Sequence, residues 1–394
     1  MCFQDALAGR VLPYAFPMER FDAIVVGAGP AGSSAALRLS RAGARVLLLD
    51  RERFPRDKPC GGGLTERAVK QLPVSVDPVV EEVVDRFELG FRYGTRFVRG
   101  GERPLVLMTQ RRRLDAFLAA QAAEAGAEFR DGVRATSVES DGTVRFDGTA
   151  AQADVVIGAD GVNGLTARAL GLGVRRHGVA LEGNVAFVHA REDRWRGRAV
   201  VELGTVPGGY AWVFPKGDHV NVGVGGWRTE GPRLREHLER ACTGYGLPFE
   251  RLESVRGYRL PMRCAGETLV RERVLLVGDA AGLVDPLSGD GIYEALLSSR
   301  LAVEAVVAGE LETYGERLAR ELDPMMSASW SAKLAFDRFP RLAFMIARTP
   351  PAWRLAERLL RDELPDPRKA PGTMRAPLEA LRALAHAAGA TSAR

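Results

Sequence analysis

The sequence predicts an α/β protein in which a parallel-sheet domain is interrupted by a β-rich domain and followed by C-terminal helices. Three patterns predict this class: short apolar runs that end in glycine turns, alternating residues in the middle of the chain, and a helical pattern beyond residue 310. The 394 residues leave room for two or three domains, and an apolar fraction of 46% is ordinary for a globular protein.

The stretch from Phe21 to Asp50 has the spacing of a dinucleotide-binding unit. Residues 21–26 form a short apolar run that predicts a buried parallel strand. A G-x-G-x-x-G motif follows, formed by Gly27, Gly29 and Gly32. The helix that begins near Pro30 would direct its N-terminus at a phosphate group. Asp50 ends the second strand about 20 residues later, where a carboxylate would bind ribose hydroxyls.

Bulk properties exclude several classes of function. The net charge of +5 is spread along the chain without a basic run interleaved with aromatics, so we expect no nucleic-acid binding. The four cysteines show no C-x-x-C spacing, which argues against a metal site or disulfides and suits a reducing cytoplasm. No apolar run reaches the roughly 18 residues of a spanning helix. Residues 1–17 are interpreted as a mobile tail or an early start codon.

A proline- and glycine-rich stretch follows Asp50. Adjacent glycines exclude a helix or strand interior, so alone it would be interpreted as a surface loop. However, the fingerprint followed by Pro-Arg-Asp-Lys-Pro-Cys-Gly-Gly at residues 55–62 resembles the geranylgeranyl reductase family of FAD-dependent oxidoreductases. That family lies within the para-hydroxybenzoate hydroxylase-like group of flavoproteins. The resemblance covers about residues 20–310 and implies a Rossmann-type FAD-binding domain with Cys60, Gly61 and Gly62 beside the isoalloxazine ring.

Two further motifs carry the resemblance with departures from the usual pattern. Arg111 opens a predicted helix and takes the family position that contacts the flavin, although a solvated basic cluster is the alternative. Residues 158–164 resemble the Asp-Gly motif of flavoprotein hydroxylases, which touches FAD and is linked to pyridine-nucleotide use. Gly164 stands where serine is usual and Ala167 where the first arginine is usual, so the motif departs from the family pattern at these two positions.

A second signature lies at residues 278–292. It resembles the G-D-A-A-G and P-x-x-G-x-G segments of the same flavoproteins, in which the aspartate at Asp279 holds the ribityl chain. The following helix would present its positive N-terminus to the flavin N1–C2=O edge and stabilise the anionic reduced flavin. The fingerprint and the resemblance together predict cofactor contacts at Gly27, Gly29, Pro30, Ala31, Gly32, Asp50, Arg51, Gly61, Gly62, Arg111, Asp160, Gly161, Gly278, Asp279, Gly289, Gly291 and Ile292.

Aromatic residues alternate in the β-rich region. Tyr210, Trp212 and Phe214 would share one face of a strand, which by itself fits an aromatic core. The family has a Y-x-W-x-F-P motif here, and the resemblance implies that these three residues bound an apolar substrate cavity. His219 begins the expected partner strand, and we identify no carboxylate or second histidine to make it catalytic.

The C-terminal region combines bulky apolar and basic residues between 325 and 348. This composition favours a lid or a membrane-surface contact, with ordinary helix packing as the alternative. The predicted boundaries assign a tail to 1–17, the FAD-binding domain to 18–75, 105–175 and 263–310, the β-rich substrate domain to 76–104 and 176–262, and the helical cap to 311–394.

The resemblance implies a reductase that saturates carbon–carbon double bonds of an isoprenoid chain by hydride transfer from reduced, non-covalently bound FAD. NADPH or another reductant, including a partner protein, would supply the electrons, and no metal is expected. An aromatic hydroxylase or halogenase of the same fold and a non-catalytic flavin or lipid carrier are the alternatives. Cys60 is either a proton donor to the alkene or a small residue that fits against the ring.

Overall fold

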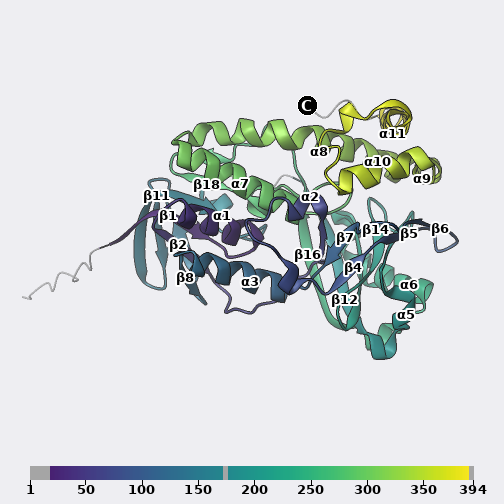
Figure 1. The fold of residues 1–394 in the computed structure, drawn as a ribbon, viewed down its shortest axis with the longest axis horizontal. Helices are drawn as coiled ribbons and strands as arrows, with labels where there is room; N and C mark the ends of the chain where they lie inside the picture. The colour runs from purple at the N-terminus through teal and green to yellow at the C-terminus, as the bar shows by residue number, and fades with distance from the viewer. Residues whose placement is uncertain (1–17, 172–175, 390–394) are drawn as a thin grey trace, which may run out of the picture.

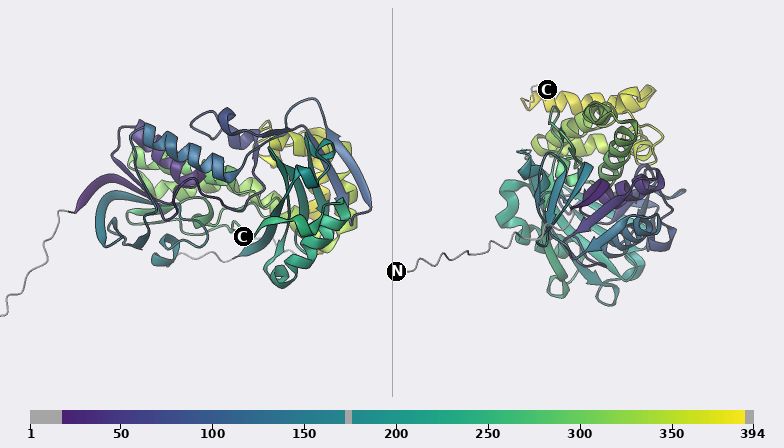
Figure 2. Two further views of the ribbon diagram at one scale, coloured as in Figure 1. Left: turned by 90° about the horizontal axis from the view of Figure 1, so that it is seen from below. Right: turned by 90° about the vertical axis from the view of Figure 1, so that its left-hand side faces the viewer.

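The computed structural model describes residues 18–171 and 176–389, and the prediction for residues 1–17 lies outside this range. Two sheets lie side by side, and C-terminal helices form a layer along both of them (Figures 1 and 2). Within the described ranges, no helix combines the length and the apolar character that crossing a lipid bilayer requires.

The first sheet is the predicted parallel sheet. Its main path runs β17-β18-β11-β1-β2-β8, and every neighbouring pair is parallel except β17 with β18. A hairpin of β9 and β10 extends β11. The strands are β1 (Glu19–Val26), β2 (Val46–Asp50), β8 (Glu128–Asp131), β9 (Ala135–Val138), β10 (Thr143–Phe146), β11 (Thr149–Gly158), β17 (Val270–Arg271) and β18 (Val274–Leu276).

Alternation along β1 assigns the two faces of this sheet. Ala23 and Val25 pack under the helices, whereas Ile24 and Val26 pack on the opposite face in a second apolar cluster. Both faces are therefore buried, as the continuous apolar runs of the sequence indicate. The helices of this part of the chain are α1 (Pro30–Arg41), α2 (Glu66–Val69), α3 (Arg111–Glu124), α4 (Thr166–Ala169) and α7 (Ile292–Ala308).

The second sheet has seven strands in the order β16-β12-β15-β14-β13-β5-β6, antiparallel except between β13 and β5. One face packs against α6 (Leu234–Tyr245) and α5 (Glu192–Trp195), and the other face borders a large cavity. The strands are β5 (Arg86–Phe91), β6 (Thr95–Gly100), β12 (His177–Ala186), β13 (Arg198–Leu203), β14 (Tyr210–Pro215), β15 (His219–Trp227) and β16 (Glu253–Pro261).

A small third sheet connects the two parts. It pairs β7 (Val106–Met108) with β3 (Gly63–Thr65) and with β4 (Glu82–Val84). Because β3 follows the glycine-rich turn directly, this sheet fixes that turn between the two larger sheets.

The cap consists of α8 (Tyr314–Arg338), α9 (Pro340–Ala347), α10 (Pro350–Leu360) and α11 (Arg375–Ala387). In Figure 1, α8 lies along α7, and the yellow helices lie over the β-rich part. Ring contacts agree with this view, since Phe344 of α9 stacks on Phe91 at 4.9 Å and Trp353 of α10 lies 6.4 Å from Phe87. The cap therefore covers the open face of the second sheet.

Candidate active site

The fingerprint turn uses its three glycines for different reasons. A Cβ on Gly27, whose φ is +103°, would lie 2.4 Å from the Ala159 carbonyl oxygen, and one on Gly32 would lie 1.8 Å from the Gly27 carbonyl oxygen. Gly29 is different, because the nearest atoms to its Cβ position are the guanidinium nitrogens of Arg56 at 3.6 Å and Arg111 at 3.9 Å. The space above Gly29 is therefore open and faces two cations, which suits a phosphate.

The carboxylate of Asp50 accepts hydrogen bonds from two backbone amides, one of them in the same turn. Its Oδ2 accepts a hydrogen bond from the Ala28 amide at 2.7 Å, and its Oδ1 accepts one from the Glu52 amide at 2.9 Å. Asp50 also lines the cavity, where its ribose role stays a prediction. Arg51 lies at the rim, exposed and paired with Glu52 at 3.2 Å.

Two arginines converge on one buried carboxylate beside the turn. Arg111 donates from Nε and Nη2 to Asp115 at 2.7 Å each, and Arg56 donates from Nη1 to Asp115 Oδ2 at 2.6 Å. Burial works against the charge of Arg111, but Asp115 raises its pKa above the usual range. Asp115 therefore orients the two guanidinium groups beside the fingerprint turn.

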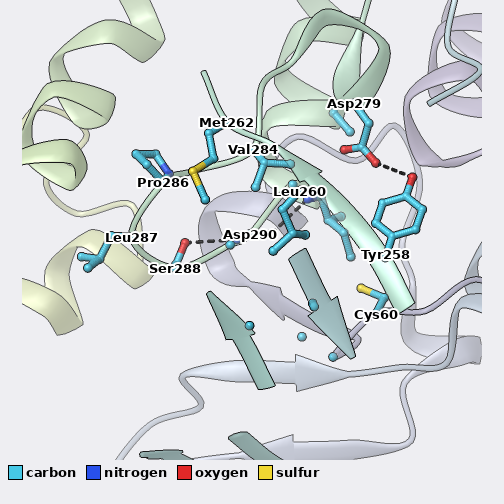
Figure 3. Close-up of a pocket in the computed structure, with 18 of the residues that line it drawn as sticks. Cys60, Tyr258, Leu260, Met262, Asp279, Val284, Pro286, Leu287, Ser288 and Asp290 are labelled. Atoms are coloured by element: carbon cyan, nitrogen blue, oxygen red, sulfur yellow. Dashed lines mark hydrogen bonds between the residues drawn. The ribbon is translucent and has the colours of Figure 1, made fainter. Parts of the chain in front are cut away.

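Asp279 has partners that the sequence motif did not indicate. Its Oδ2 accepts a hydrogen bond from Lys58 Nζ at 2.9 Å. It accepts a second one from the Tyr258 hydroxyl at 3.0 Å (Figure 3). Although burial opposes ionisation, the Lys58 ammonium lowers the pKa of Asp279, and Asp279 in turn raises the pKa of Lys58. The carboxylate is therefore charged and fixed in place at the cavity wall.

The backbone amide and the backbone carbonyl of Cys60 each bind a side chain of the β-rich domain. The Cys60 amide donates to Glu182 Oε1 at 2.7 Å, and its carbonyl accepts from Lys216 Nζ at 3.0 Å. The Gly62 amide donates to the sulfur at 3.4 Å, and the sulfur points into the cavity in Figure 3. Burial raises the pKa of Glu182, while Lys216 lowers it. The peptide of Cys60 is thus clamped between Glu182 of β12 and Lys216, which directly follows β14.

The aromatic strand packs directly against this turn. Tyr210, Trp212 and Phe214 all line the cavity, with ring centroids 6.0 and 6.3 Å apart along the strand. A Cβ on Gly61 would lie 2.9 Å from the Phe214 ring, so glycine is required for this approach. The Trp212 Nε1 donates to Asn221 at 2.8 Å, and the Tyr210 hydroxyl donates to the Ser288 carbonyl.

Asp160 and Gly161 also lie at the cavity, but the Asp160 carboxylate has a local partner set. Its Oδ2 accepts from the Leu165 amide at 2.7 Å and from the amide and hydroxyl of Thr166 at 2.9 Å each, which secures the start of α4. A Cβ on Gly164 would lie 2.1 Å from the Asp160 carboxyl carbon, which accounts for glycine where serine is usual. Burial raises the pKa of Asp160.

The turn before α7 is more acidic than the sequence interpretation assumed. Gly289, Gly291 and Ile292 line the cavity, but Asp290 and the fully buried Glu294 also sit at the helix start. Arg67 approaches them at 4.0 and 3.6 Å respectively. Burial raises the pKa of both carboxyl groups. Carboxyl groups and Arg67 thus share this position with the N-terminus of α7, and the role of this helix end at the flavin stays a prediction.

His219 has a carboxylate neighbour after all, since its Nδ1 lies 2.7 Å from Asp218 Oδ1. It is nevertheless absent from the cavity wall, and Asp218 is exposed. Among the described residues, no group of three or more histidine, cysteine and carboxylate side chains has the arrangement of a metal site.

A single cavity of about 1230 Å³ connects these features. It extends from the fingerprint turn past Cys60 and the aromatic strand to the inner faces of the cap helices. Its far end is apolar, and the residues there include Phe87, Leu89, Ala199, Val201, Phe336, Trp353, Leu355, Leu359, Leu378 and Leu381. Pro30, Ala31 and Gly278 line the opposite end, and Gly32 lies just outside it.

Comparisons with known proteins identify the domain that carries this site. A model of an FAD binding domain matches residues 20–298. The menaquinone reductase of Mycobacterium tuberculosis is 34% identical over 323 residues, covering 74% of this chain and 77% of the reductase. The chloroplastic geranylgeranyl diphosphate reductase of Oryza sativa subsp. japonica is 32% identical over 334 residues, covering 77% of this chain and 70% of that protein.

A solved structure extends the likeness to nearly the whole chain. The geranylgeranyl bacteriochlorophyll reductase-like protein from Thermoplasma acidophilum superposes with a TM-score of 0.74 at 22% identity, covering 95% of this chain and 97% of that chain. At that identity the match describes the fold alone, whereas the sequence relatives and the matched domain establish the family. The chain belongs to the geranylgeranyl reductase family of FAD-dependent oxidoreductases.

Proposed function

We propose that the protein saturates carbon–carbon double bonds of an isoprenoid chain, carried by a geranylgeranyl lipid or a prenyl quinone. The continuous cavity carries this proposal. Its volume of about 1230 Å³ exceeds the roughly 300–1,000 Å³ of pockets for drug-sized ligands. A dinucleotide cofactor at one end and an apolar chain at the other therefore have room together. The names of the two sequence relatives support the same substrate class.

The residues at the fingerprint end fit FAD. The open side of Gly29 and the guanidinium groups of Arg56 and Arg111 suit the pyrophosphate, and Asp50 suits the adenosine ribose. Asp279 remains an acceptor for ribityl hydroxyls beside Lys58. When bound and reduced, FAD supplies the hydride for alkene reduction.

Protein groups would supply the proton and the position of the alkene. Cys60 is our candidate general acid, because its sulfur points into the cavity and its peptide is clamped by Glu182 and Lys216. Positioned proton transfer is worth about 10²–10⁴-fold in rate. The alternative, in which Cys60 only packs against the ring, predicts no such effect. The aromatic strand would hold the alkene in place and exclude water.

The electron donor is proposed to be NADPH or a partner protein. Gly164 and Ala167 depart from the motif linked to pyridine nucleotides, which is why a partner protein is proposed beside NADPH. We propose a cytoplasmic location, which the absence of paired cysteine motifs supports.

The decisive experiment is mass spectrometry of the lipids of cells with and without the protein. We expect a prenyl lipid or quinone to gain two hydrogens per reduced bond only when the protein is present. Gly29→Val, which fills the phosphate space, is the matched inactive control. Unchanged masses of every prenyl lipid, with FAD bound to the purified protein, would refute the proposal.

A parallel assay separates reduction from oxygen chemistry. The purified enzyme, reduced chemically under nitrogen, is mixed with the prenyl substrate and its flavin reoxidation is followed. A hydroxylase or halogenase would need oxygen and an aromatic substrate for this step, whereas the reductase needs neither. Oxygen-dependent turnover of an aromatic compound would replace the proposal with the alternative function.

A further inference from the structure

Helix α9 presents an unpartnered apolar face to solvent. Ala343 and Phe344 are buried, and Phe344 packs between the rings of Phe91 and Phe97. Leu342 and Met345, three residues apart on the outer side, are 55% and 56% exposed. Residues three or four apart share one face of a helix, so these two large side chains form one exposed apolar strip.

Strand β6 lies beside α9, where Phe97 contacts Phe344 with ring centroids 5.6 Å apart. Val98 points to the opposite face of the sheet and is not part of this strip. The adjoining Arg99 donates from Nη2 to the Arg348 carbonyl at 3.1 Å, which holds β6 beside the end of α9. We name Leu342 and Met345, with the arginines described next, the α9 surface.

The arginines around this strip give it a positive rim. They are Arg92, Arg99, Arg338, Arg341 and Arg348. Within the described residues, none of them forms an ion pair with a carboxylate, although many other arginines of the chain do. Apolar residues inside a basic rim match a surface that combines anionic headgroups with an apolar interior.

The cavity reaches the protein surface beside this rim. Pro340, Ile346 and Ala347 of the α9 segment line it, together with the exposed Arg92 and Asp337. A long apolar substrate that leaves a membrane at α9 would thus meet the cavity wall without crossing open water.

We propose that the α9 surface docks on an anionic lipid bilayer and places the cavity entrance against it. The proposal rests on the lipid substrate of the proposed function, but the docking itself is a separate property. Two inserted side chains and a few charges give weak, reversible binding that salt reduces.

Flotation of the full-length FAD-loaded protein with lipid vesicles tests this. We expect binding to vesicles that contain phosphatidylglycerol, little binding to pure phosphatidylcholine vesicles, and release by high salt. The variant Leu342→Ser/Met345→Ser should lower the partition coefficient at least about tenfold, and Arg338→Gln/Arg341→Gln should abolish the preference for phosphatidylglycerol. Val307→Ser, which alters a valine that is 63% exposed on α7, is the matched control.

The outcomes separate docking from catalysis. Turnover of a detergent-dissolved prenyl substrate should be the same in the wild type and in all variants. If none of these proteins turns the substrate over, the proposed reductase function is refuted, and the flotation result still decides the docking proposal. Wild-type-like flotation of Leu342→Ser/Met345→Ser, or no flotation of the wild type, would overturn the docking proposal. Binding of the α9 surface to a purified partner protein with no vesicle binding would overturn it as well.

Discussion

Removal of the Asp115 carboxylate is the perturbation with the clearest structural consequence. Asp115 is fully buried and accepts three hydrogen bonds from Arg56 and Arg111 at 2.6–2.7 Å. Hydrogen bonds to charged groups contribute about 1.5–3 kcal/mol each. The sum over the three bonds would exceed the usual free-energy cost of breaking a buried ion pair. Because Arg56 keeps some contact with solvent, the measured range of about 3–5 kcal/mol for breaking a buried pair is the better guide.

Asp115→Ala should therefore lower the melting temperature of FAD-free protein by about 4–6 °C, because an unfolding entropy of about 2.1 cal/mol/K per residue gives about 1.2 °C per kcal/mol for this chain length. Added FAD should recover part of this loss, because its phosphates would become the partners of the two arginines. Glu124→Ala changes an exposed acid on the same helix and is the control. If calorimetry finds the melting temperatures of the two variants within about 1 °C of each other, the stabilising free energy assigned to this buried ion pair is refuted.

Four further outcomes are expected. Gly29→Val should purify with little flavin absorbance per protein, and normal occupancy would contradict the placement of the phosphates. Trp212→Ala should slow reoxidation of reduced flavin by a long prenyl substrate but not reduction by dithionite; equal losses in both steps would make the aromatic strand ordinary core. Cys60→Ala should keep FAD and its reduction but lose alkene saturation at least about tenfold, with Cys60→Ser intermediate; a wild-type rate would leave Cys60 as packing. Burial lowers the pKa of Lys333 to about 8, so the unfolded chain holds a proton that the folded chain lacks above that pH. Stability should then rise between about pH 8 and pH 10, by at most about 1.4 kcal/mol per pH unit, and urea unfolding of Lys333→Met should lack this rise.

Short-range sequence patterns predicted those parts of the site whose conformation is set within a few neighbouring residues. The fingerprint turn, the buried parallel strands and the shared face of Tyr210, Trp212 and Phe214 follow from spacing within a few residues. The sheet class, the interrupted order and the C-terminal helices were likewise predictable, because periodicity reports which side of an element is buried.

The partners of those local features were not predictable. Glu182 and Lys216 meet Cys60 across 122 and 156 residues of chain, and Lys58 meets Asp279 across 221. A single glutamate or lysine on a strand has the same local pattern whether it faces water or a buried amide. Only the pairing of β12, β14 and β15 brings these groups to the glycine-rich turn, so sequence spacing carried no signal for them.

The pairing of β11 with both β1 and β18 has a consequence for how the protein is made. The sheet that carries the fingerprint cannot be completed until Leu276, the last residue of β18, has left the ribosome. Gly158 ends β11, so 276 − 158 = 118 residues of synthesis separate the two. At about 5–20 residues per second this interval lasts roughly 6–24 s. Throughout it the apolar edge of β11 lacks its β18 neighbour, so the yield of protein able to bind FAD depends on what shields the nascent chain.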